Sequence, residues 1–311
     1  MADARLPSLV AQIADGAVVT TAEAVRQGLS KDELRRLVAD GALDRVVRGV
    51  YATPAATGWE ADHRRLVVAT ATARISHEPL VLGGPSAAVV YGLPILSRPP
   101  AVVCAATELL RGTKTGRTLR TIAPPGAEGT TTVGPFHLTT PARTVLDIAR
   151  LMSTADGVAA ADAALRRGLT TRAELRAVAD RLAGHVGVAR ARRVVDLADE
   201  RSESPGESWS AVVIDDLGLP RPERQEAFRD DTGLIGRADF WWPEHGVVGE
   251  FDGRVKYGRS NPSGRPPEEV LWAEKGREDR LRRRVAAVAR WTIDELRHPA
   301  ALRRVLTPVL R

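Results

Sequence analysis

The stretch GRADFWWPEHGVVGEFDG, residues 236–253, indicates the fold of the C-terminal part of the chain. Two apolar runs, residues 238–242 and 247–251, lie on either side of the segment Pro-Glu-His-Gly, whose residue types are typical of tight turns. We therefore predict two antiparallel strands joined by a turn.

Three carboxylates of this hairpin are expected on one face. If Glu244 and His245 are the two loop residues, Asp239 lies directly opposite Glu250. Because side chains alternate between the two faces of a strand, Asp252 shares the face of Glu250. Two carboxylates repel by roughly 4 kcal/mol at about 4 Å and an effective dielectric of about 20. The cluster therefore requires a cation, a shared proton or a basic side chain.

A metal ion is one way to stabilise these carboxylates. Oxygen ligands on strands favour Mg²⁺, which binds one or two carboxylates and completes its coordination with water and phosphate oxygens. The cluster therefore predicts a Mg²⁺ site. The alternative is an edge hairpin whose carboxylates face water or are neutralised by Arg237 and Arg254.

The length and composition of the chain limit its class. With 311 residues it is long enough for two or three domains. The single cysteine, Cys104, excludes an intramolecular disulfide and is typical of a reducing cytosol. The first residues lack the apolar core of a signal peptide, and no apolar run approaches the length of a membrane span. We expect a cytoplasmic protein that does not bind membranes.

The formal net charge of +6 is concentrated near the C-terminus. Residues 271–311 contain eleven Lys and Arg against five Asp and Glu, so the rest of the chain is balanced. A concentrated basic region is typical of a protein that binds a polyanion. The alternative is a compositional bias, because Arg supplies 41 of the 45 basic residues throughout the chain.

The N-terminal sixty residues have the pattern of a winged helix. A first helix is expected over residues 6–14. The segments at 20–23 and 30–33 match the capping box and each opens a helix, with Gly28 in the turn between them. Residues 43–53 then alternate like a two-stranded wing around Arg48.

Basic side chains of this module are predicted to contact DNA. The helical pattern of residues 31–40 buries its leucines and leaves Lys31, Arg35 and Arg36 on the outside, and Arg48 lies at the wing. The alternative is a three-helix module that binds protein, because the segment has no net charge.

The region from 59 to 200 is predicted to be α+β and to connect the two ends. It contains no metal-ligand spacing, phosphate loop or nucleophile elbow, and its isolated histidines are expected to be structural. Helices are expected over 59–77, over 84–91, from Thr140 onward and in two or three further segments; strands are expected at 101–105, 117–123 and 136–138.

The C-terminal region has the element order of a small α/β sheet domain. A helix at 207–217 precedes a strand at 224–228 and the acidic hairpin; a charged helix, a strand and a last helix follow at 268–284, 285–292 and 299–310. We thus predict a mixed α/β chain with three domains: a winged helix at 1–58, a central region at 59–200, and a sheet flanked by helices at 201–311.

This order resembles the PD-(D/E)xK restriction-endonuclease superfamily. The segments SPGES, GRADFWWPEHGVVGEFDG and WAEKGREDRLRR, within residues 201–297, are similar to the DUF559 branch, which is related to very-short-patch-repair endonucleases. The segment TAEAVRQGLSKDELRRLVADGALDRVVRGVYAT resembles the winged helix of AbiEi-type antitoxins from type IV toxin–antitoxin systems.

The first resemblance implies a catalytic site. Asp239 and Glu250 would hold Mg²⁺, with Mn²⁺ as an alternative, and the carbonyl of Phe251 would be a third ligand; the ion would activate water. Glu207 would be the acidic residue of the first helix. Its alternative role is in a capping box, because the sequence Ser-Pro-Gly-Glu has that pattern.

The chain departs from the superfamily at Asp252, where the pattern has a catalytic lysine. Lys275 on the following helix is the first candidate to replace it, and Lys256 is the second. The alternative for Lys275 is an i,i+4 ion pair with Asp279. Arg277 and Arg280 are expected to bind phosphates or to solvate the helix.

Three functions follow from these patterns. The leading prediction is a Mg²⁺-dependent DNA endonuclease or nickase targeted by the winged helix. The alternative is a non-catalytic DNA-binding regulator of the antitoxin type, with a cognate toxin as its protein partner. The third is a scaffold whose C-terminal sheet binds another protein.

Overall fold

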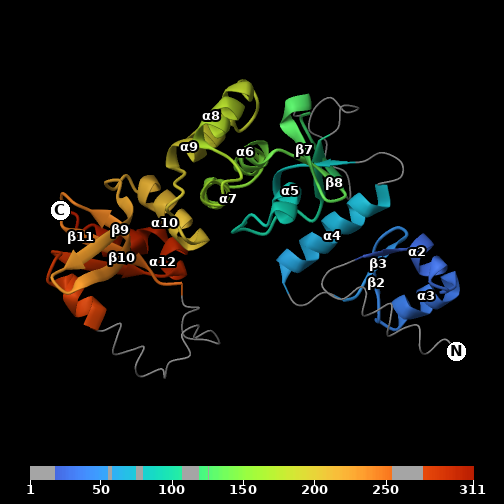
Figure 1. The fold of residues 1–311 in the computed structure, drawn as a ribbon, viewed down its shortest axis with the longest axis horizontal. Coiled ribbons are helices and arrows are strands. Elements are labelled where there is room, and N and C mark those ends of the chain that lie inside the picture. Colours follow the sequence, from blue (N-terminus) through green and yellow to red (C-terminus); the bar gives the residue numbers. More distant parts are fainter. Residues whose placement is uncertain (1–17, 55–57, 75–79, 107–118, 125, 254–275) are drawn as a thin grey trace.

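The computed structural model describes residues 18–54, 58–74, 80–106, 119–124, 126–253 and 276–311. These residues form an elongated mixed α/β chain with three separate sheets, which confirms the expected fold class. A three-stranded sheet lies at the N-terminal end, a four-stranded sheet at the C-terminal end, and a five-stranded sheet with most of the helices between them (Figure 1). Among the described helices, none has the length and apolarity needed to span a bilayer.

The N-terminal elements fit a winged helix. The predicted helix at 6–14 lies outside the described residues. Both capping boxes form: the hydroxyl of Thr20 accepts from the Glu23 N–H at 3.1 Å, and that of Ser30 accepts from the Glu33 N–H at 3.2 Å. The elements are β1 (Val19–Thr20), α2 (Thr21–Arg26), α3 (Lys31–Ala39), β2 (Asp44–Val47) and β3 (Val50–Ala52), with strand order β1-β3-β2.

The middle of the chain contains a five-stranded sheet. Two of its strands, β4 and β7, were not predicted from the sequence. The elements before the helical part are α4 (Trp59–Arg74), β4 (Val81–Leu82), α5 (Gly84–Tyr91), β5 (Val103–Ala106), β6 (Leu119–Ile122), a 3₁₀ turn (Ala127–Gly129), β7 (Thr130–Val133) and β8 (Phe136–Thr139). The strand order is β6-β5-β4-β8-β7.

A cluster of helices follows this sheet. Its members are α6 (Pro141–Leu151), α7 (Thr154–Arg166), α8 (Arg172–Arg181) and α9 (Val188–Leu197). Thr140 precedes α6, where the sequence predicts the helix to begin, but its side chain makes no capping hydrogen bond. A fully buried carboxylate, Asp147, is held within α6 by Arg143 and Arg150, each at 2.8 Å.

The C-terminal sheet has the predicted order of elements. A helix was expected over residues 268–284. Residues 276–282 are helical, residues 283 and 284 form a turn, and residues 268–275 lie outside the described residues. A short helix, α12, precedes the last one and was not predicted. The elements are α10 (Pro205–Asp216), β9 (Glu223–Asp230), β10 (Gly233–Trp242), β11 (Val247–Phe251), β12 (Ala287–Trp291), α12 (Ile293–Arg297) and α13 (Pro299–Leu306). The strand order is β12-β11-β10-β9, with β11 and β12 parallel.

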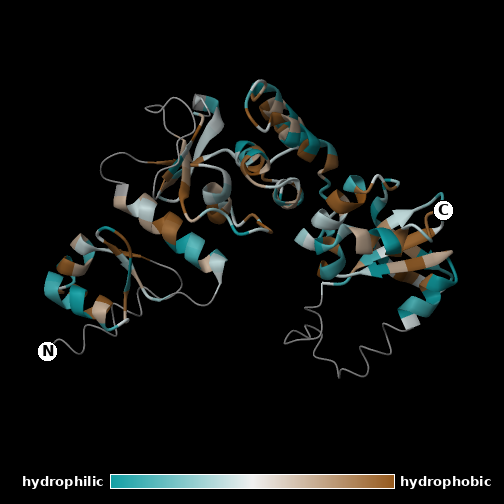
Figure 2. Cartoon of the chain, turned by 180° about the vertical axis from the view of Figure 1, so that it is seen from behind, coloured by the Kyte–Doolittle hydropathy of each residue, from teal (hydrophilic) through white to brown (hydrophobic). Residues whose placement is uncertain are grey.

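Both faces of this sheet carry apolar clusters. The indole of Trp242 is buried with Phe240 and Trp291 beneath α10, α12 and α13, and its N–H donates to the Pro220 carbonyl at 2.7 Å. Trp241 lies on the other face, edge-on to Phe228 with ring centroids 5.0 Å apart. In Figure 2, hydrophobic residues lie along the strands of this sheet. The helix of residues 276–282, next to the grey trace, is mostly hydrophilic.

Buried polar contacts join this sheet to the helix cluster across the boundary expected at residue 200. The carboxylate of Asp162 on α7 accepts from the guanidinium of Arg224 on β9 at 3.1 Å, from the hydroxyl of Ser208 at 2.7 Å and from the N–H of Asp199 at 2.6 Å. Asp162 is 1% exposed and Arg224 is 5% exposed. The ion pair is thus satisfied out of contact with water.

Candidate functional site

The acidic hairpin has the predicted register. Phe240 pairs with Gly249 and Trp242 with Val247, and the same register places Asp239 opposite Glu250. Four residues, rather than two, separate the paired strands. The prediction that two carboxylates meet across the hairpin is therefore consistent with the geometry.

Asp239 lies in a half-buried position and makes no ion pair with a described basic side chain. One oxygen, Oδ2, accepts from the N–H of Phe251 at 2.9 Å, and Oδ1 accepts from Nε2 of Gln225 at 3.2 Å. Burial raises the pKa of Asp239 to about 6, and the nearby charges of Glu207 and Glu250 act in the same direction. A cluster of carboxylates with such a pKa is a candidate for a functional site.

Gln225 completes the cluster and was missed by sequence reasoning. Its amide Nε2 donates to Oε2 of Glu207 at 2.9 Å as well as to Asp239, so it bridges the two acids. It is the single non-glycine residue with positive φ in the described part of the chain, at 55°. Such a conformation costs about 1–3 kcal/mol and often marks a functional site. The observed pairing of Ala238 with Glu226 and of Phe240 with Arg224 places Gln225 opposite Asp239, and this register could have pointed to Gln225.

Glu207 takes part both in the start of α10 and in the cluster. The Ser204 hydroxyl accepts from the Glu207 N–H at 3.2 Å and donates to Oε1 at 2.7 Å. Oε2 accepts from the N–H of Glu203 at 2.9 Å, one residue before the position that a capping box uses. The side chain of Glu207 is buried and contacts the amide of Gln225.

Glu250 is neutralised by arginines from two elements. Oε1 accepts from Nη2 of Arg277 and Oε2 accepts from Nε of Arg290, each at 2.9 Å. Within the residues that the structure describes, no group of three or more His, Cys, Asp or Glu side chains is arranged to hold a metal ion. A Mg²⁺ ion on Glu250 would have to displace a guanidinium, so these residues do not form a ready ion site.

The remaining residues of the predicted catalytic site are only partly placed. Lys256, Lys275 and Arg254 lie outside the described residues. Asp252 is half-buried at the end of β11, where its N–H donates to the Trp291 carbonyl at 2.8 Å. Arg280 forms a bidentate ion pair with Asp230, in which Nε donates to Oδ2 at 2.7 Å and Nη2 donates to Oδ1 at 2.6 Å.

Among the described residues, the arginine contacts of this region differ from those offered by the sequence. Arg237, which the alternative interpretation placed beside the carboxylates, pairs with Glu203 on the chain before α10. Arg277, which we expected to bind phosphate or solvate its helix, binds Glu250. These ion pairs depend on elements that are distant in sequence from the hairpin.

The predicted DNA-binding side chains of the winged helix are exposed. Lys31, Arg35 and Arg36 lie on the outer side of α3, and Arg48 lies at the turn of the wing beside Gly49, whose φ is 79°. Arg35 pairs with Asp32 on the same helix. The side chains of Lys31, Arg36 and Arg48 make no hydrogen bond or ion pair with another described residue.

The wing is anchored to the helix that follows it. Arg65 on α4 is buried, and its Nη2 donates to the carboxylate of Asp44 on β2 at 2.7 Å. Its other nitrogen, Nη1, lies 3.9 Å from Asp62. This contact holds the back of the wing and leaves Arg48 and the outer face of α3 exposed.

The winged helix coincides with a known family. Residues 8–54 match the AbiEi antitoxin family of transcriptional regulators. The match includes α2, α3 and both strands of the wing, and it ends just after β3.

Other relatives are similar over parts of the chain. Two uncharacterized proteins of Mycobacterium tuberculosis, MT2308 of strain CDC 1551 / Oshkosh and Rv2248 of strain ATCC 25618 / H37Rv, are each 35% identical over 114 residues, which is 37% of this chain. The chain spans 42% of the length of these relatives. Among solved structures, the RV2827C protein of M. tuberculosis is 15% identical with a TM-score of 0.39, over 73% of this chain and 89% of that one.

Proposed function

We propose that the protein is a DNA-binding transcriptional regulator of the AbiEi antitoxin type, whose winged helix binds the DNA. The observation that carries this proposal is the coincidence of the family match at residues 8–54 with exposed basic residues on α3 and on the wing. This function is the alternative among the sequence-based predictions, and it is better supported than the nuclease.

The geometry suggests how each part contacts the duplex. In helix-turn-helix proteins the second helix enters the major groove and its first residues contact base edges. Here α3 would supply Lys31, Arg35 and Arg36 to the groove and its walls. Arg48 on the wing would contact the neighbouring phosphates, which fix orientation rather than sequence.

Equilibrium binding to DNA tests this proposal. The full chain is titrated into a fluorescent duplex taken from upstream of its own gene and into an unrelated duplex of equal length. We expect tighter binding to the first duplex, and an affinity that falls steeply between about 50 and 200 mM salt because bound phosphates release counterions. Equal and salt-insensitive binding to both duplexes would overturn it.

A cognate toxin is the protein partner that this proposal implies. Co-purification of the untagged product of the neighbouring gene with the tagged chain tests it. A 1:1 complex at equal concentrations is the expected result, and elution of two separate species contradicts a partnership with that product.

The second candidate function is a metal-dependent DNA endonuclease. The specific observation that favours it is the cluster of Glu207, Asp239 and Glu250, in which one carboxyl has a pKa near 6. The proposed Mg²⁺ or Mn²⁺ ligands are Asp239, Glu250 and the carbonyl of Phe251, and a bound ion would polarise water and phosphate. Such an ion requires Arg277 to leave Glu250, which is the point against this candidate.

Cleavage of supercoiled plasmid separates the two candidates. The wild type, Asp239→Asn and the turn variant Glu244→Gln are incubated with Mg²⁺ or Mn²⁺. Ion-dependent nicking by the wild type and by Glu244→Gln, but not by Asp239→Asn, supports the nuclease. Intact plasmid in every lane, with DNA binding retained, rejects it and leaves the regulator.

A further inference from the structure

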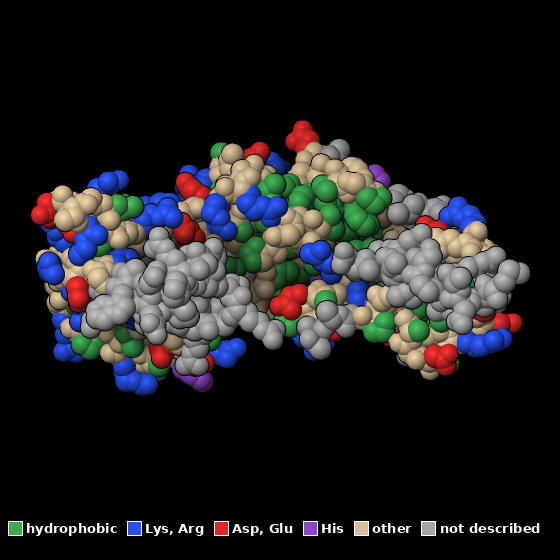
Figure 3. Space-filling view, turned by 60° about the horizontal axis from the view of Figure 1, so that its bottom comes forward, with side chains coloured by type: hydrophobic (Ala, Val, Ile, Leu, Met, Phe, Trp, Pro, Cys, Tyr) green, Lys and Arg blue, Asp and Glu red, His purple; other side chains and the backbone are tan. Residues whose placement is uncertain are grey.

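A cleft of about 920 Å³ lies between the two ends of the molecule, and its lining contains none of the predicted catalytic or DNA-binding residues. Its walls come from the residues after β3, from α4, from α5 and the segment that follows it, from the end of α7 and from the start of α10. Its volume is within the range of small-molecule sites, which is about 300–1,000 Å³. Figure 3 shows hydrophobic side chains gathered in the middle of one face, with basic side chains beside them.

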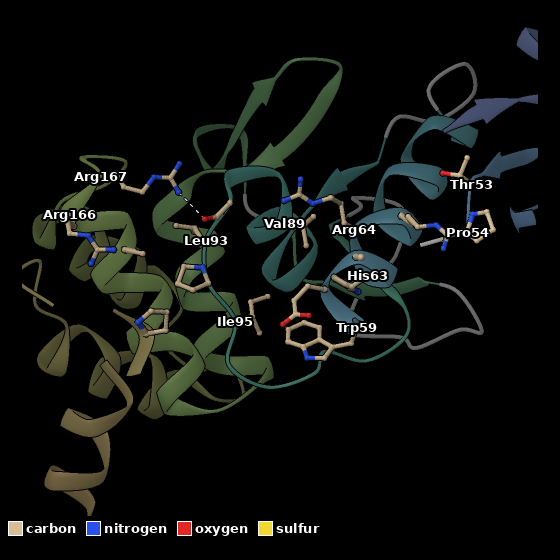
Figure 4. Close-up of a pocket in the computed structure, with 17 residues that line it drawn as sticks. Thr53, Pro54, Trp59, His63, Arg64, Val89, Leu93, Ile95, Arg166 and Arg167 are labelled. Carbon is tan, nitrogen blue, oxygen red and sulfur yellow. Dashed lines mark hydrogen bonds between the residues drawn. The ribbon is translucent and has the colours of Figure 1, made fainter. Parts of the chain in front are cut away.

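One side of the cleft is aromatic and polar. Trp59 is half-buried and His63 is 5% exposed, and the two lie four residues apart on the same side of α4 (Figure 4). Burial lowers the pKa of His63, and the backbone of Pro85 acts in the opposite direction. The Nε2 atom of His63 is buried without a hydrogen-bond partner among the described residues. Unpaired buried polar atoms are rare and call for a partner.

The other side is basic. Arg166 and Arg167 at the end of α7 lie across the cleft from Trp59 and His63, with Leu93 between them in Figure 4. Nη1 of Arg167 donates to the carbonyls of Tyr91 and Gly92 at 2.8 and 3.1 Å, and Nη1 of Arg166 donates to the Ser202 carbonyl. Each guanidinium has five N–H groups, so these contacts position it and leave donors for a ligand.

The charges of the lining favour an anion. Arg64, Arg65, Arg166 and Arg167 line the cleft together with a single carboxylate, that of Glu60. Arg65 is already paired with Asp44 and Asp62. The other three arginines have no ion pair within the described residues, so the cleft has an excess of positive charge.

We propose that this cleft binds a mononucleotide, with its phosphate at Arg166 and Arg167 and its base against Trp59 and His63. A base offers a flat ring for the indole and an N–H group for Nε2 of His63, while planar guanidiniums match the geometry of phosphate. This proposal does not rest on the proposed function, because it concerns a different surface and is tested without DNA.

Calorimetric titration of the full chain with the four ribonucleoside 5′-monophosphates, adenosine and inorganic phosphate tests the proposal. We expect at least one monophosphate to bind at least about tenfold more tightly than either adenosine or phosphate, because both walls of the cleft then contribute. Absence of heat with every monophosphate at about 1 mM would overturn it, as would equal affinity for phosphate alone.

Four variants assign the site. Trp59→Leu and Arg166→Gln should each weaken binding by about tenfold or more, since a stacked base and a charge-assisted hydrogen bond are each worth about that factor. Trp59→Phe keeps a ring and should bind within about threefold of the wild type. The control is Arg176→Gln, an exposed arginine on α8 with no described ion pair, which should bind like the wild type. Unchanged affinity in Trp59→Leu and Arg166→Gln would place any binding elsewhere and contradict the proposal.

Discussion

The two ends of the molecule use arginine in opposite ways. In the winged helix, Arg36 and Arg48 are exposed and make no ion pair with a described residue, although this segment has no net charge. In the C-terminal sheet, Arg277, Arg280 and Arg290 are paired with carboxylates, although the surrounding sequence is the most basic part of the chain. Ion pairing therefore offsets part of the positive charge of the C-terminal part, whereas Arg36 and Arg48 remain available for the proposed contact with DNA.

The paired end should be sensitive to loss of a partner. Asp162→Ala leaves the buried Arg224 with only the more distant carboxylate of Asp199, at 4.0 Å, and we expect the free energy of unfolding to fall by about 3–5 kcal/mol. Urea denaturation followed by tryptophan fluorescence measures this. The control is Asp216→Ala, which removes an exposed partner of Arg193 and should cost at most about 1 kcal/mol. Similar losses in both variants would show that burial of the pair does not matter.

Asp239 is the exception at this end, because the described charged side chains that act on it are those of Glu207 and Glu250. Its pKa of about 6 lies above the usual 3.8, so the folded state holds the proton more tightly than the unfolded state does. Asp239 therefore destabilises the fold fully above about pH 6, and this cost disappears as the pH falls toward 4. Asp239→Asn should raise the free energy of unfolding by about 1–3 kcal/mol at pH near 7.5 and leave it unchanged near pH 4.

A pH series of urea denaturation on wild type and variant checks this prediction. Glu244→Gln, which removes an exposed carboxylate from the same hairpin, is the control and should show no such pH dependence. A stability difference that is constant across the series, or a variant that is less stable at neutral pH, contradicts the account of the acidic cluster.

The stability of the winged helix should depend on the N-caps of its helices more than on ion pairs. Ser30 begins α3 by accepting from the Glu33 N–H and by contacting its carboxylate. Ser30→Ala should lower the free energy of unfolding of the winged helix by about 1 kcal/mol, whereas Ser30→Asp, another good N-cap, should have little effect. Circular dichroism during urea denaturation measures both, and equal losses would mean that the hydroxyl does not cap.

Local patterns were enough to predict the hairpin register, both capping boxes and the order of the C-terminal elements. The two unpredicted strands of the five-stranded sheet lacked such patterns: β4 has only two residues, and β7 is Thr-Thr-Thr-Val with mostly exposed side chains. Strand β7 is recognised only by its pairing with β8, which the sequence does not specify.

The candidate site was predictable only where its residues were close in sequence. The facing of Asp239 and Glu250 follows from one turn. The pairing of Glu250 with Arg290 depends on the parallel register of β11 and β12, whose connection is long, and no local rule sets it. The same holds for Gln225, which reaches Glu207 only because α10 packs against one face of the sheet.

The difference between the two ends can be measured directly by fluorescence anisotropy with the upstream duplex at fixed salt. Arg36→Glu/Arg48→Glu reverses two unpaired charges of the winged helix, and Arg282→Glu/Arg283→Glu reverses two exposed charges at the end of the helix of residues 276–282, where Arg282 pairs with Glu278. We predict that the first pair weakens DNA binding by about 100-fold and that the second changes it by less than about threefold. Loss of binding in the C-terminal variant with retention in the N-terminal variant would contradict the assignment of DNA binding to the winged helix.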